Sequence, residues 1–212
     1  MHSTDRQLAA NRNLPLNLVV GLSALVAPAL HTATDVMEWY SRGFTDAQLW
    51  LNLLAFLPMP LLLLGIYSVQ EPKPGAAGLL GALLYGAAFG YFTYTTLYAL
   101  VERVPTYDEL WARLGHVYTF FGGLMVCGGS LFGWSAFRIG WLPRFSVLLF
   151  LSGIIVNLIL AILPAPDILQ TIGSAMRNFG LMAMGYAILF GKRRQRPNPA
   201  VNTDAPSARR LP

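Results

Sequence analysis

Six apolar segments, each close to the length that crosses a lipid bilayer, alternate along the chain with short polar or proline-rich breaks. They cover residues 14–31, 49–67, 76–101, 110–137, 145–163 and 168–190, and we expect the first helix to extend to Tyr40. A helix needs about 20 mainly apolar residues to cross the ~30 Å hydrocarbon layer. The pattern predicts an all-α membrane protein, a single bundle of six transmembrane helices.

Composition agrees with this class and excludes others. Of the 212 residues, 55% are hydrophobic and only 12% are charged, whereas charged residues make up about 25% of an ordinary soluble domain. The net charge of +5 lies beside the apolar segments and in the C-terminal tail, so we expect no nucleic-acid binding. The single cysteine, Cys127, excludes an intrachain disulfide and a cysteine-based zinc site.

The chain divides into three parts. Residues 1–13 are expected to form a cytoplasmic N-terminal segment, residues 14–191 the transmembrane domain, and residues 192–212 a basic, disordered cytoplasmic tail. The tail is rich in Pro, Asn, Ala, Ser and Arg and has no apolar period, which is typical of disorder.

The distribution of Lys and Arg predicts the orientation. If the N-terminus lies inside, the outer loops hold three basic residues, Arg42, Arg103 and Arg113. The inner segments then hold nine, not counting the distant Arg209 and Arg210: Arg6, Arg12, Lys73, Arg138, Arg144, Lys192, Arg193, Arg194 and Arg196. Positive residues concentrate on the cytoplasmic side, so the split predicts that both termini lie on the cytoplasmic side and that the number of spans is even. An alternative is cleavage of the first segment as a signal peptide at Ala27-Pro28-Ala29, which would leave five spans.

Arg177 lies mid-way through the sixth segment and is the strongest functional signal. A charge at that depth is costly, so it normally faces protein or water and has a partner. The antiparallel layout places other polar residues at similar depth in the outer half. We expect Arg177 to bind ligand with six further residues, His116, Tyr94, Tyr98, Asn157, Asn178 and Glu38.

His31, Asp35 and Glu38 share one helical face because they are spaced by four and three residues. A carboxylate beside a histidine is an acid–base pair, so His31 and Asp35 are candidate catalytic residues. The pattern favours a pocket, open to the outer side, that binds a lipophilic or amphipathic small molecule, and chemical transformation of that molecule is left open. A wet helical extension above the bilayer is the structural alternative for the same three residues.

Other readings stay open. His31 and His116 are candidate axial ligands of a b-type haem, and His31, Asp35 and His116 are a candidate zinc set. A small-solute or proton-coupled transporter and a non-catalytic membrane subunit are further alternatives. No motif specifies a reaction or a cofactor, and whether the protein is an enzyme is left undecided.

Glycines recur on the third, fourth and sixth segments, including the pair Gly86 and Gly90. Small residues four apart let helices approach closely in lipid. We expect them to pack helices within the chain, with a homodimer through these faces as the alternative.

Two stretches carry a family resemblance. The run from His31 through Asp35 and Trp39 to Pro58, and the turn Gly140-Trp-Leu-Pro143-Arg144, resemble uncharacterised bacterial six-span membrane proteins. The resemblance implies a six-helix bundle in a bacterial inner membrane and implies no activity.

Overall fold

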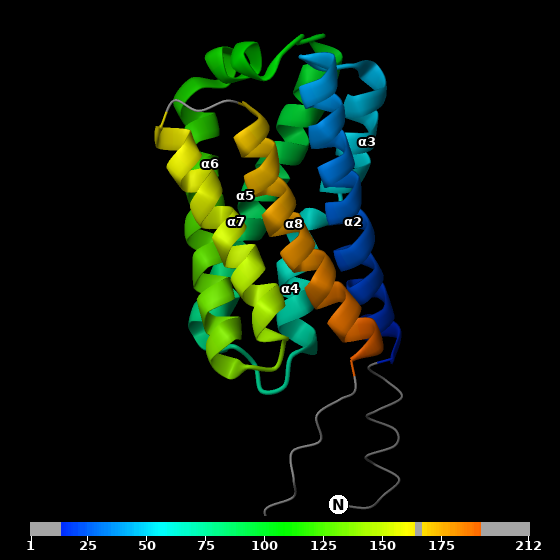
Figure 1. Ribbon diagram of the computed structural model, residues 1–212, viewed down its shortest axis with the longest axis vertical. Helices are drawn as coiled ribbons and strands as arrows, with labels where there is room; N and C mark the ends of the chain where they lie inside the picture. The colour runs from blue at the N-terminus through cyan, green and yellow to red at the C-terminus, as the bar shows by residue number, and fades with distance from the viewer. Residues whose placement is uncertain (1–13, 164–166, 192–212) are drawn as a thin grey trace, which may run out of the picture.

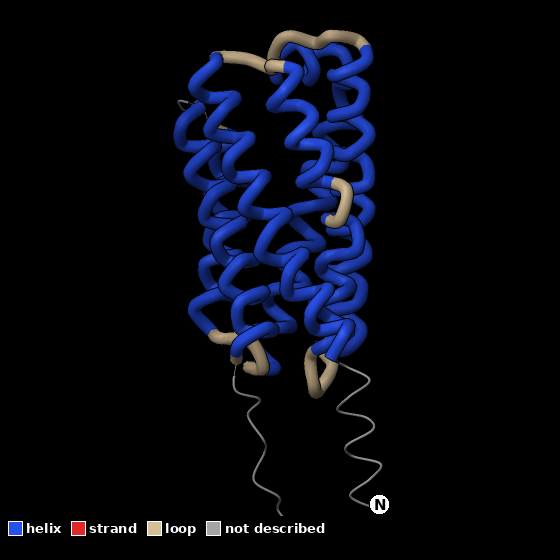
Figure 2. The backbone as a smooth tube through the Cα atoms, turned by 90° about the vertical axis from the view of Figure 1, so that its right-hand side faces the viewer, coloured by secondary structure: helices blue, strands red, loops and turns tan. Residues whose placement is uncertain are grey.

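The computed structural model describes residues 14–163 and 167–191, and within them all regular structure is helical. Seven helices run along one long axis (Figures 1 and 2). Their bounds are α2 Leu14–Ser41, α3 Asp46–Phe56, α4 Met59–Val69, α5 Gly75–Val101, α6 Tyr107–Ile139, α7 Arg144–Ile162 and α8 Asp167–Phe190. The expected all-α class is confirmed. The segments 1–13 and 192–212 lie outside the described residues.

Four helical stretches are long and apolar enough to cross a membrane, which indicates a multi-pass membrane protein. They are Pro15–Ser41, Asp46–Val69, Gly75–Val101 and Tyr107–Ile139. A fifth apolar helix, Arg144–Leu160, is shorter. Helix α8 has 24 residues but includes Arg177 and Asn178, whose polarity lowers its hydropathy.

The helices form a closed ring in the order α2, α3/α4, α5, α6, α7, α8, with α8 packed against both α2 and α7. We call the end where α2 begins and α8 ends the terminal end, and the opposite end the distal end (Figure 1). The distal end carries the loops after α2 and α5, and the terminal end carries those after α4 and α6. The main core fills the ring with buried aromatic and aliphatic side chains, including Tyr85, Phe89, Phe132 and Phe150.

The second span is broken at Leu57 and Pro58, half-way along the bundle (Figure 2). Pro58 and Pro60 each lack a backbone N–H, so two carbonyls one turn earlier lose their helical donors. The hydroxyl of Thr93 on α5 lies 3.3 Å from one of them, the carbonyl of Phe56, and 2.8 Å from the carbonyl of Phe89 on its own helix, so the two acceptors share its single proton. A side chain from the neighbouring helix thus partly replaces the donor that Pro60 cannot supply.

Helix α6 is kinked at Gly115, whose backbone is non-helical (φ 55°, ψ −133°). The turns before the kink lie across the distal end of the bundle, at the top of Figure 1. The indole N–H of Trp111 donates to the hydroxyl of Thr119 across the kink, at 3.2 Å. Only glycine adopts this combination of φ and ψ without strain.

Glycines let the helix backbones touch. A Cβ at Gly81 on α5 would lie 2.6 Å from the carbonyl oxygen of Gly128 on α6, and a Cβ at Gly128 would lie 2.8 Å from that of Gly81. Gly185 on α8 faces Gly21 on α2 in the same way. These glycines serve packing within the chain, whereas Gly123 has open space beside it.

Candidate functional site

Arg177 lies inside the bundle with only 4% of its surface exposed. Helix α8 passes close to α7 at this point because Gly153 has no side chain, and a Cβ there would collide with the backbone nitrogen of Arg177. The guanidinium therefore projects inward, where Nη1 approaches the sulfur of Met125 on α6 at 3.2 Å. Its Cζ lies 5.7 Å from the centre of the Phe89 ring, a favourable cation–π distance.

His31 on α2 lies between Arg177 and Asp35. Its Nδ1 is 3.5 Å from Nη2 of Arg177, and its Nε2 is 3.4 Å from Oδ1 of Asp35. Arginine only donates, so Nδ1 accepts and the proton sits on Nε2, facing the carboxylate. The imidazole thus links a cation on α8 to an anion on α2.

Ser174 completes this link from α8. Its hydroxyl accepts from Nη2 of Arg177 at 3.1 Å and also interacts with the Asp35 carboxylate. Serine and arginine are three residues apart and so share one helical face. No salt bridge joins Arg177 to a carboxylate within the described part of the chain. Asp35 instead acts on the arginine electrostatically, and His31 and Ser174 connect the two by polar contacts.

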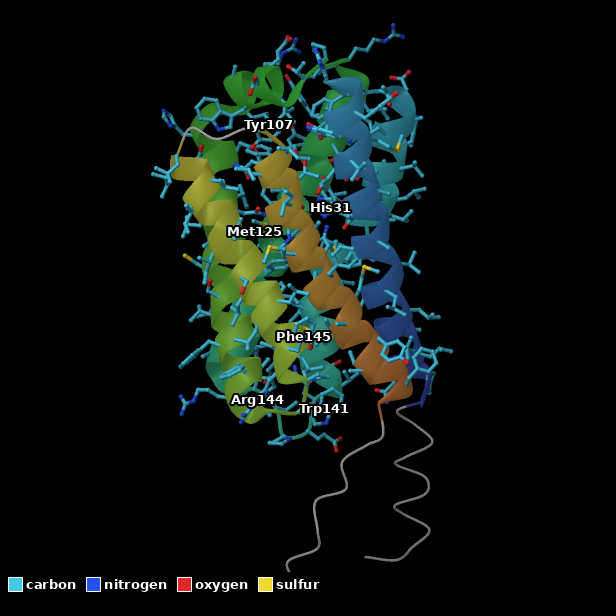
Figure 3. All side chains as sticks on the ribbon, viewed as in Figure 1. His31, Tyr107, Met125, Trp141, Arg144 and Phe145 are labelled. Atoms are coloured by element: carbon cyan, nitrogen blue, oxygen red, sulfur yellow. The ribbon has the colours of Figure 1, made fainter. Side chains whose placement is uncertain are left out.

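Aromatic rings hold His31 in place on the terminal side. The Phe56 ring meets the imidazole edge to face with centroids 4.6 Å apart, and Phe89 does so at 6.2 Å. Phe56 is the last residue of α3, so the first half of the broken second span ends against the imidazole of His31. Figure 3 shows His31 and Met125 near each other inside the bundle.

Four buried polar atoms in this layer have no hydrogen-bond partner among the described residues. They are Nε of Arg177, Oδ2 of Asp35, Oδ1 of Asn178 and Oδ1 of Asn157. Most buried polar atoms in proteins are hydrogen-bonded. This layer therefore has donor and acceptor capacity that the protein itself does not use.

A second set of contacts surrounds this cluster. The amide of Asn178 donates to the hydroxyl of Thr32 at 3.1 Å, and that hydroxyl donates to the carbonyl of Pro28 at 2.9 Å. The hydroxyl of Thr34 lies 3.1 Å from the side-chain oxygen of Asn52 on α3. Polar contacts thus join α2 to both of its neighbours at this level.

The sequence-predicted residues divide into those that meet at Arg177 and those that lie elsewhere in the bundle. The structure brings His31, Asp35 and Arg177 together, with Asn178 one residue further on. Tyr94 is 53% exposed and belongs to a row of tyrosine rings on α5 with Tyr98. Asn157 contacts α8 at Gly173.

His116 lines a separate groove on α6 of about 450 Å³, with Thr119, Phe120, Gly123, Leu124 and Cys127. Among the described residues, no group of three or more His, Cys, Asp or Glu side chains could hold a metal ion. The candidate zinc set is therefore not gathered, since His116 is separated from the contacting pair His31 and Asp35. The two candidate haem ligands lie in different environments, since His31 is buried and His116 is exposed.

Glu38 lies one turn beyond Asp35 on α2 and faces the distal end. It acts electrostatically on Tyr107 and Tyr118, the first residue of α6 and a residue beyond the kink. The face of α2 that carries these three residues thus has two environments. His31 and Asp35 lie beside Arg177, whereas Glu38 lies near Tyr107 and Tyr118.

Sequence reasoning missed several members of the cluster. Ser174 carries a signal that could have been used, because it lies one turn before Arg177. Met125, Phe56 and Phe89 carry none, since apolar residues within apolar spans look alike until the rotation of each helix is known.

No family model, curated protein or solved structure matches this chain.

Proposed function

We propose that the chain is a six-span protein of a bacterial cytoplasmic membrane with both ends in the cytoplasm. Helices α7 and α8 run beside the four long apolar helices (Figure 1), and 19 residues in α7 extend about 28 Å at 1.5 Å per residue. Counted along the sequence, Lys and Arg are in excess in the segments on the side of the two chain ends, which favours the cytoplasmic side for the terminal end. The distal end then faces outward.

The function that this arrangement supports best is binding of a lipophilic or amphipathic small molecule at the cluster of Arg177, His31 and Asp35. The observation that carries the proposal is that Nε of Arg177 and Oδ2 of Asp35 are both buried and unpartnered. A head group with an acceptor for the first and a donor for the second would satisfy both atoms. Arginine suits carboxylate, phosphate and carbonyl oxygens.

Two features favour binding over proton transfer or transport. Nδ1 of His31 faces Arg177, so it is not free to act as a base towards a substrate. On the terminal side the cluster meets Phe89, whose ring packs on Tyr85, and Tyr85 packs on Phe150. This aromatic layer separates the cluster from the terminal end, and its one polar atom, the buried hydroxyl of Tyr85, has no hydrogen-bond partner among the described residues.

Replacing Arg177 with methionine tests the proposal. Native mass spectrometry of gently purified wild-type protein is expected to show a non-covalently bound small molecule, which Arg177→Met loses. The matched control is Arg113→Met, because Arg113 is an exposed arginine at the distal end that pairs with Glu109. That variant is expected to retain the molecule.

Thermal melting separates a binding role from a structural one. If Arg177→Met does not fold, Arg177→Lys keeps the charge and loses the planar donors, and it is expected to fold with weakened retention. A wild-type protein that repeatedly shows only the bare chain mass would contradict the proposal. Retention of the same molecule by folded Arg177→Met would contradict it as well.

A further inference from the structure

A pair of arginines marks the terminal end of the bundle, far from the buried cluster. Arg138 lies in the last turn of α6 and Arg144 in the first turn of α7, and both are exposed. Neither forms a salt bridge within the described part of the chain. Figure 3 shows Arg144, Trp141 and Phe145 together at this end, opposite Tyr107.

Aromatic stacking holds one of these arginines in place. The guanidinium carbon of Arg144 lies 5.7 Å from the centre of the Phe137 ring, and Phe137 in turn stacks on Trp134 with rings 6.3 Å apart and 20° from parallel. An arginine fixed over a ring keeps the edge of its guanidinium free for a bidentate contact. Less conformational entropy is then lost when it binds an anion.

Local helix electrostatics explain Arg138 but not Arg144. A cation in the last turn of a helix interacts favourably with its carbonyl end, whereas a cation in the first turn faces the positive end. Helix α7 begins at Pro143 without a side-chain cap or an acidic residue in its first turn. An external anion would neutralise the two arginines and this helix start together.

Large apolar side chains flank the arginines. Phe145 is 73% exposed, Trp134 60% and Trp141 37%. Tryptophan and arginine at this level of a membrane protein are typical of the boundary between head groups and acyl chains. A partner with both a phosphate and an apolar chain fits this surface better than a soluble anion does.

We propose that Arg138 and Arg144, with Trp141 and Phe145 beside them, form a binding site for the phosphate of an anionic phospholipid. Juxtamembrane basic residues attract anionic lipids electrostatically, and the stacked Arg144 adds a fixed contact. The site is independent of whatever Arg177 binds.

The test uses full-length protein in nanodiscs of zwitterionic phosphatidylcholine that contain a minor fraction of one brominated lipid. Bromine on the acyl chains quenches nearby tryptophans, and Trp134 and Trp141 are the two at this end. Brominated phosphatidylglycerol is expected to quench wild-type fluorescence more strongly than brominated phosphatidylcholine at the same fraction. The preference corresponds to roughly fivefold in relative affinity per arginine.

The variant Arg138→Gln with Arg144→Gln is expected to lose this preference, and Arg113→Gln at the distal end is expected to keep it. Arg144→Lys keeps the positive charge but loses the planar group that stacks on Phe137, so this variant is expected to keep part of the preference for phosphatidylglycerol. Equal quenching of the wild type by the two lipids would overturn the proposal. An unchanged preference in the folded double variant would also overturn it.

Discussion

In the terminal half of the bundle α2 meets α8, and α5 meets α6, backbone to backbone at glycines, whereas nearer the distal end α2 and α8 meet through polar side chains. Gly21 faces Gly185, and Gly81 faces Gly128, with carbonyl oxygens where a Cβ would be. Nearer the distal end, α2 and α8 are joined instead by His31 to Arg177 and by Thr32 to Asn178. One half thus depends on the absence of side chains and the other on their hydrogen bonds.

This difference has a physical reason. Lipid chains are as apolar as leucine, so helices in a bilayer associate through close packing and hydrogen bonds. Backbone contact at glycines provides tight packing but no chemical group for a ligand. Polar contacts specify geometry and leave donors and acceptors available, so we expect the buried ligand in the interior of the distal half.

The largest effect is expected from filling a glycine contact in the terminal half. Gly128→Leu would place its side chain against the backbone of α5, and backbone cannot move aside without separating the helices. We expect a loss of about 3 kcal/mol or more, seen as loss of the monodisperse peak in size-exclusion chromatography. Gly123→Leu on the same helix meets open space and serves as the control. A normal melting temperature for Gly128→Leu would contradict the backbone contact.

The distal half is tested by a double-mutant cycle on Arg177 and Asp35. Asp35→Asn removes the nearest counter-charge of a buried arginine, a change that costs about 3 kcal/mol when a buried pair is broken. Arg177→Met leaves the carboxylate with His31 alone. If the two charges balance each other through His31, the double variant is expected to lose about 1–2 kcal/mol less than the sum of the single losses.

The exposed pair Arg113 and Glu109 is the matched control, because water screens its charges. Its cycle is expected to show no measurable coupling in thermal melts. Strict additivity at Arg177 and Asp35 would mean that the imidazole does not connect them.

Sequence reasoning predicted the helices far better than their contacts. The apolar runs and their Gly and Pro breaks place every span to within a few residues. The kink at Gly115 is missed, because a single glycine within an apolar helix is usually tolerated without a bend. Its effect depends on where the distal turns pack.

The site was only partly predictable for a related reason. The spacing of His31 and Asp35 places them on one face whatever the fold, and that local relation appears in the structure. Depth alone suggested that His116 and Tyr94 join Arg177. Whether they do depends on how α5 and α6 rotate about their axes, which the backbone contacts at Gly81 and Gly128 determine.

A smaller effect concerns the boundary between the two halves, where the second span is broken. Thr93→Val removes the hydroxyl that donates to the carbonyl of Phe56 and is expected to cost about 1 kcal/mol. In a Pro60→Ala background the new backbone N–H serves that carbonyl, so the same change should cost less. Melting curves of the wild type, Thr93→Val, Pro60→Ala and the double variant measure the cost of losing the hydroxyl in each background. An equal cost in both backgrounds would show that the Thr93 hydroxyl does not replace the missing backbone donor.

The smallest effect compares helix starts at the two ends. Distal helices α3 and α6 begin with Thr45 and Thr106, whose hydroxyls accept from backbone N–H groups, whereas α7 begins at an uncapped Pro143. Pro143→Asp and Pro143→Asn both supply a side-chain cap and both lose the proline ring, so their difference isolates one negative charge. In zwitterionic lipid the aspartate variant should be the more stable by about 0.3–1 kcal/mol.

In anionic lipid the order of the two variants is informative. An aspartate beside Arg138 and Arg144 competes with the lipid phosphate, so Pro143→Asp should lose the preference for phosphatidylglycerol while Pro143→Asn keeps it. Quenching by the two brominated lipids measures both variants under identical conditions. If the aspartate variant keeps the full preference, the phosphate does not bind at the start of α7, and the basic residues at this end act only as a diffuse surface charge.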